Sequence, residues 1–158
     1  MTYHEVVLLG RVLLAFAISF AIGFEREIRG SAAGDRTYAL VGTASAAVVA
    51  VTERVSPQAI AGVVTGIGFI GAGLVFREGR RDIRGMTSAA TMFAVTGMGV
   101  VVGTGHWLLG IAVGILILVD LELRNLPFLN RLDARRYAHG KRDDMAPPMS
   151  MGEPPEPS

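Results

Sequence analysis

Two long stretches without a charged residue limit the fold of this chain more than any other feature. Residues 59–76 contain no charge, and at about 1.5 Å per helical residue they nearly cross a hydrocarbon core of roughly 30 Å. Residues 86–119 are also uncharged and would make a helix about 50 Å long, so this stretch must fold back. The reversal is expected between Gly103 and Trp107, because glycines loosen a helix and tryptophan favours the headgroup level. The sequence therefore predicts an integral membrane protein.

Composition excludes several kinds of chemistry. Charged residues make up 18% of the chain against 51% hydrophobic ones, whereas about a quarter of a soluble domain is charged. The chain has no cysteine, so disulfides, thiolate metal sites and thiol nucleophiles are excluded. Its three histidines lie far apart, and no serine occupies a G-x-S-x-G elbow. We expect no catalytic residue, metal ligand or cofactor, and no enzymatic activity.

Basic residues set the predicted topology. Two further apolar stretches, residues 6–24 and 38–51, bring the number of spans to five if both cross the bilayer. Nearly all of the 15 lysines and arginines then lie on one side, as the positive-inside rule requires of the cytoplasmic face. The prediction is an all-α, polytopic bundle of five transmembrane helices with the N-terminus outside and the C-terminus cytoplasmic. The spans are expected at about residues 5–24, 37–52, 59–76, 86–103 and 106–123.

The two ends of the chain differ in character. The first span has no basic region before it, which favours a retained helix over a cleaved signal peptide. Residues 125–144 mix apolar residues with arginines and are expected to form a basic juxtamembrane segment on anionic lipid. Residues 145–158 are rich in proline and are expected to be disordered.

Small residues recur at helical spacing in nearly every span. Residues 66–71 also match G-x-G-x-x-G, but no βαβ context accompanies the match, so nucleotide binding is not expected. Helices in lipid associate through close backbone approach at small residues. Packing within one protomer is the favoured use of these residues, with dimerisation as the alternative. The dense glycine cluster at residues 66–73 could also mark a broken helix at a binding site. The spaced pairs and rows are Gly62 and Gly66; Gly99 and Gly103; Gly110 and Gly114; Ala15, Ser19 and Gly23; and Gly42, Ala46 and Ala50.

Charged residues near the span ends offer candidate contacts. Glu25 has two possible arrangements: an i, i+4 pair with Arg29, or an inward position paired with Arg36 or Arg84. Thr87 is expected to cap the helix that follows Arg84 and Gly85. The resulting helix N-terminus would suit a lipid phosphate or a carboxylate from residues 25–27.

Arg11 is the one charged residue away from the ends of the predicted spans, since Asp120 and Glu122 are expected at the membrane edge. Its long aliphatic stem can carry the guanidinium to the nearby interface, so snorkelling is favoured over a functional role.

Four segments in order resemble the MgtC/SapB family of bacterial inner-membrane proteins. They are residues 23–27 (GFERE), 33–42 (AGDRTYALVG), 66–73 (GIGFIGAG) and 83–90 (IRGMTSAA). The resemblance covers most of residues 1–123. Mild departures are Asp35, Met86, Ser88 and Phe93, and we expect no counterpart of the C-terminal soluble domain of longer members.

The resemblance implies a five-helix membrane domain in the bacterial inner membrane. It implies a non-enzymatic regulator of adaptation to low magnesium, related to virulence in pathogens, that binds other membrane proteins such as the ATP synthase. A homo-oligomer and a transporter or channel for magnesium or another cation are alternatives; nucleic acid is not an expected partner. The candidate functional residues taken from the motifs are Glu25, Arg26, Glu27, Gly34, Arg36, Thr37, Gly66, Gly68, Gly71, Gly73, Arg84, Gly85 and Thr87.

Overall fold

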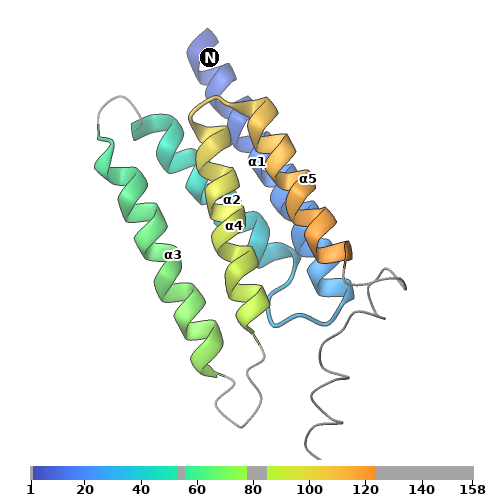
Figure 1. Cartoon of the computed structure of the whole chain (residues 1–158). Helices are drawn as coiled ribbons and strands as arrows, with labels where there is room; N and C mark the ends of the chain where they lie inside the picture. The colour runs from blue at the N-terminus through green and yellow to red at the C-terminus, as the bar shows by residue number, and fades with distance from the viewer. Residues whose placement is uncertain (1, 53–55, 78–84, 124–158) are drawn as a thin grey trace, which may run out of the picture. The chain divides into compact units, whose positions relative to one another are not determined.

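Five α-helices make up all of the regular structure that the computed structural model describes, which covers residues 2–52, 56–77 and 85–123. In chain order they are α1 (Tyr3–Ile28), α2 (Asp35–Thr52), α3 (Gln58–Arg77), α4 (Met86–Gly103) and α5 (Trp107–Leu123) (Figure 1). They belong to one compact unit that ends at Leu121, and only Glu122 and Leu123 of the next unit are described.

The all-helical prediction is confirmed, and each predicted span is helical. Helices α1, α3 and α4 are long and apolar enough to cross a membrane by length and composition. The described part of α5 has 17 residues, roughly 26 Å of helix. Helix α2 has 18 residues and is rich in alanine, valine and threonine. The basic segment at 125–144 and the proline-rich tail lie outside the described residues.

Local sequence signals define the helix ends. At the start of α1, Thr2 and Glu5 form a capping box: the Glu5 amide donates to Thr2 Oγ1 at 3.4 Å, and the Thr2 amide donates to Glu5 Oε2 at 2.7 Å. The predicted reversal after Gly103 is confirmed, since α4 ends there and α5 begins at Trp107. Gly105 makes this turn with a φ of +94°, a conformation that favours glycine.

The core forms where α2 packs against α1 and α4 through small residues. A Cβ atom built on Gly99 would lie 2.7 Å from the Gly42 carbonyl oxygen, and one on Gly103 would lie 2.7 Å from that of Ala46. Ser19 of α1 packs directly against Gly42. These contacts confirm packing within one protomer for the small residues of α1, α2 and α4.

Helix α3 does not follow that prediction. A Cβ atom at Gly62 or Gly66 would meet no atom within 4 Å, so these glycines serve no close approach inside this chain. Packing within the protomer is therefore the wrong interpretation for this pair. The broken-helix alternative is also wrong, because α3 runs without interruption from Gln58 to Arg77.

Candidate functional site

The family-motif residues of α1 and α2 meet where the first helix ends and the second begins. After Ile28 the chain turns at Gly30, whose φ is +66°, and α2 starts at Asp35. Gly23 permits this return, because a Cβ atom there would lie 2.7 Å from the Asp35 Cα. The glycine thus brings the start of α2 against the last turns of α1.

A polar cluster, defined here as Arg26, Ser31, Tyr38 and Ser88, joins α1, α2 and α4 at this end. Arg26 Nη2 donates to Ser88 Oγ at 3.4 Å, and the hydroxyls of Ser31 and Ser88 lie 3.4 Å apart. The Tyr38 hydroxyl donates to the Ser88 carbonyl oxygen at 3.2 Å, and Tyr38 is fully buried. Three helices and the α1–α2 loop are therefore held by one set of hydrogen bonds.

Glu27 caps the start of α2. Its Oε2 accepts a hydrogen bond of 3.0 Å from the Asp35 amide, one of the donors that the first turn of a helix leaves unpaired. Gly34 leaves room for this carboxylate, since a Cβ atom there would lie 2.5 Å from Glu27 Oε2. Two candidates that are seven residues apart in sequence thus act as one unit.

Glu25 forms a salt bridge with Arg29 on the same helix. The i, i+4 arrangement is therefore confirmed, and the predicted pair with Arg36 is wrong, because Arg36 is exposed on α2. The alternative partner Arg84 lies outside the described residues. Both Glu25 carboxylate oxygens are shielded from solvent, so Arg29 supplies the partner that a shielded carboxylate requires.

The start of α4 is not capped as predicted. Gly85 is the N-cap residue with a φ of +100°, and no side chain caps the helix. Thr87 lies inside α4 and is exposed, so its predicted capping role is wrong. The next residue, Ser88, contributes its hydroxyl group to the polar cluster.

The remaining candidates separate from the cluster. Thr37 is half-buried near the start of α2. Gly66, Gly68 and Gly73 are exposed on α3 with open space around them, and a Cβ atom at Gly71 would lie 3.5 Å from the Ala89 Cβ atom. The structure thus divides the motifs into a polar group at the ends of α1, α2 and α4 and an open glycine group on α3.

Sequence reasoning missed three members of the polar cluster: Ser31, Tyr38 and Ser88. A tyrosine inside an apolar stretch was the available signal, because a buried tyrosine hydroxyl usually finds a hydrogen-bond partner. The partner, a carbonyl oxygen 50 residues away, could not be read from spacing.

Arg11 binds the opposite end of the bundle. Its Nη1 donates to the Gly103 carbonyl oxygen at 3.0 Å, and a Cβ atom on Gly105 would lie 2.7 Å from its Nη2. The side chain does reach a helix end, but it closes the α4–α5 turn there, which the snorkelling interpretation did not include.

The structure also bears on metal binding. Within residues 2–52, 56–77 and 85–123, no three histidine, aspartate or glutamate side chains gather in a group that could hold a metal ion.

Comparison with known proteins identifies the family of the chain. The sequence model of the MgtC family matches residues 12–127. YhiD of Escherichia coli strain K12, named as a candidate magnesium transporter, is 37% identical over 126 residues, covering 72% of this chain and 58% of YhiD. Protein MgtC of Salmonella typhimurium strain LT2 is 40% identical over 111 residues, covering 68% of this chain and 48% of MgtC.

A third relative, protein SrpB of Synechococcus elongatus, is 35% identical over 119 residues, covering 64% of this chain and 65% of SrpB. No solved structure matches the chain. The chain spans about half the length of the curated relatives it matches. The family match, the motifs and the apolar helices agree: the chain is a membrane protein that belongs to the MgtC family.

Proposed function

We propose that this chain is a non-enzymatic regulator in the bacterial inner membrane, linked to adaptation to low magnesium, that acts through contacts with other membrane proteins such as the ATP synthase. Membership of the MgtC family and the name of YhiD support the link to magnesium. The five helices would all cross the bilayer, with the polar cluster at the cytoplasmic ends of α1 and α4.

The open space beside Gly62 and Gly73 of α3 is the observation that carries the proposal. Helix α3 packs little against the rest of the described chain. Only 6% of its residues 58–75 are buried, whereas 50% of residues 86–103 in α4 are buried. Gly62 and Gly73 share a helical face with Phe69, which is 81% exposed. Such a face permits close approach by another transmembrane helix.

Affinity capture from native membranes tests the proposal. We expect the unaltered chain to recover ATP synthase subunits and Gly62→Leu to lose them, because leucine blocks close approach on α3. Gly10→Leu is the matched control, since Gly10 of α1 also has no atom within 4 Å of an added Cβ; it should retain the partner. Equal recovery with both variants, or none from the unaltered chain, contradicts the proposal.

The alternative, a magnesium transporter or channel, has support in the name of YhiD. Reconstitution into liposomes with a magnesium-sensitive dye separates the two. The regulator proposal predicts no flux above protein-free vesicles. Flux that Glu25→Gln abolishes would favour transport instead.

A further inference from the structure

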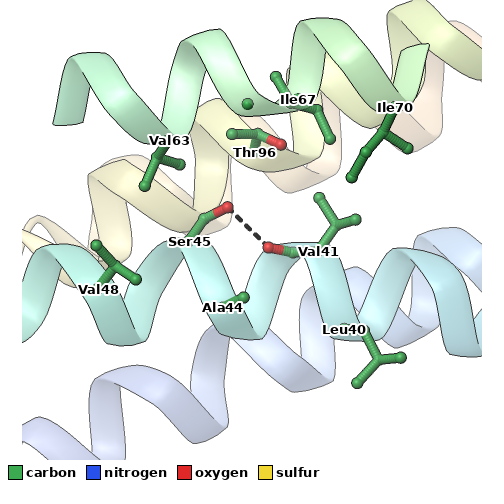
Figure 2. A pocket seen from close by; sticks show the side chains of 10 residues that line it. Leu40, Val41, Ala44, Ser45, Val48, Val63, Ile67, Ile70 and Thr96 are labelled. Atoms are coloured by element: carbon green, nitrogen blue, oxygen red, sulfur yellow. Dashed lines mark hydrogen bonds between the residues drawn. The ribbon is translucent and has the colours of Figure 1, made fainter. Parts of the chain in front are cut away.

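An apolar cleft lies between α2 and α3, with Thr96 of α4 among its lining residues. Its volume is about 350 Å³. Every third or fourth residue of α2 between Leu40 and Val48 lines one side, and Val63 and Ile70 of α3 line the other (Figure 2). The open space at Gly66 is part of this cleft.

The polar groups in the cleft are already satisfied. Ser45 donates to the Val41 carbonyl oxygen at 2.7 Å, and Thr96 donates to that of Met92 at 3.0 Å. Both hydroxyls therefore use their hydrogen atom on their own helix. The walls offer no spare donor, so the cleft suits an apolar occupant.

We infer that this cleft binds one acyl chain of an anionic phospholipid. The cleft opens sideways between two helices that we place in the bilayer, where acyl chains are the surrounding solvent. An apolar cavity of roughly 150 Å³ accepts one benzene molecule, so this cleft has room for a chain segment on the order of a dozen carbon atoms. A helix with its side chains is about 10–12 Å wide. The cleft is therefore too small to hold a whole helix.

The first turn of α2 supplies the contact for the lipid headgroup. Thr37 continues the row of Val41, Ala44 and Val48 at helical spacing, and Arg36 precedes it on the same turn. Arg36 is exposed, and no acidic side chain in the described part of the chain pairs with its guanidinium. The nearby Glu27 carboxylate is bound to the Asp35 amide. A phosphate above the cleft would therefore meet Arg36.

The inference is independent of any protein partner, and the unaltered chain tests it directly. The protein is reconstituted with a phosphatidylglycerol that carries a diazirine in the middle of one acyl chain, then illuminated. We expect the label to concentrate on residues 40–48 and 63–70. Labelling no stronger there than on the exposed faces of α1 and α5 overturns the inference.

Native mass spectrometry of the protein released from detergent gives a second readout. We expect one retained phospholipid on the unaltered chain and at least a fivefold loss of that species in Ala44→Phe, which fills the cleft. Ala112→Phe is the matched control, because Ala112 is an exposed alanine of α5 outside the cleft; it should keep the lipid. Retention by Ala44→Phe, or a dimer without lipid in the unaltered chain, overturns the inference.

Arg36 variants separate the headgroup from the acyl chain. In competition between phosphatidylglycerol and phosphatidylcholine, the unaltered chain and Arg36→Lys should prefer the anionic lipid, and Arg36→Gln should bind both equally while still retaining one lipid. An unchanged preference in Arg36→Gln contradicts the role of Arg36.

Discussion

Glu27 shows how a single side chain at the end of α1 fixes where the next helix begins. Its carboxylate accepts from the Asp35 amide, and Gly34 leaves the space that this carboxylate fills. The glycine and the acid therefore depend on each other.

This dependence predicts a non-additive effect on stability. We expect Glu27→Ala to lower the free energy of unfolding by about 1 kcal/mol, as loss of a helix cap does. Gly34→Ala should cost a similar amount in the unaltered chain, because its methyl group displaces the carboxylate. In the Glu27→Ala background, Gly34→Ala should cost nothing further. Reversible unfolding in mixed micelles measures the cycle, and two costs that simply add would contradict it.

The sequence predicted several of the residues near the α1–α2 turn that belong to the site, but it predicted few of the contacts that these residues make. The family motifs at residues 23–27 and 33–42 contain Glu25, Glu27 and Gly34. The i, i+4 rule alone predicted the Glu25–Arg29 pair. The cap on Asp35 depends on the path of the α1–α2 loop, which spacing does not give. The same limit applies to Ser88, whose partners come from two other segments.

At the scale of elements, glycines of equal appearance serve different purposes. Gly99 and Gly103 of α4 bring the backbone of α2 into contact, whereas Gly62 and Gly66 of α3 face open space. The G-x-x-x-G spacing predicted close approach for both pairs. Spacing identifies the face of a helix but not the neighbour it meets, so only the packed structure separates the two.

Gly97 and Gly99 of α4 give a matched test of this packing. Gly99→Ala places a Cβ atom 2.7 Å from the Gly42 carbonyl oxygen, and overpacking of this kind costs about 1–3 kcal/mol. Gly97→Ala meets no atom within 4 Å and should be neutral or stabilise the helix by about 0.5–1 kcal/mol. Thermal unfolding in detergent should therefore lower the Tm of Gly99→Ala alone. Equal Tm values for the two variants would show that α2 and α4 do not approach this closely.

At the scale of the whole molecule, the five helices follow from uncharged stretches, charge distribution and one glycine turn. The five-span topology of these helices is a prediction from the sequence. It is also the premise on which the cytoplasmic polar cluster, the partner face of α3 and the lipid cleft depend.

Labelling of single cysteines in intact cells tests that premise most directly, and the chain has no native cysteine to interfere. The sites are Thr2, Ser56 and Thr104 on the predicted outer side and Ala32 on the predicted cytoplasmic side. A membrane-impermeant maleimide should label the Thr2→Cys, Ser56→Cys and Thr104→Cys variants in intact cells, and Ala32→Cys only after the membrane is permeabilised. Labelling of Ala32→Cys in intact cells, or protection of Ser56→Cys, would contradict the five-span topology.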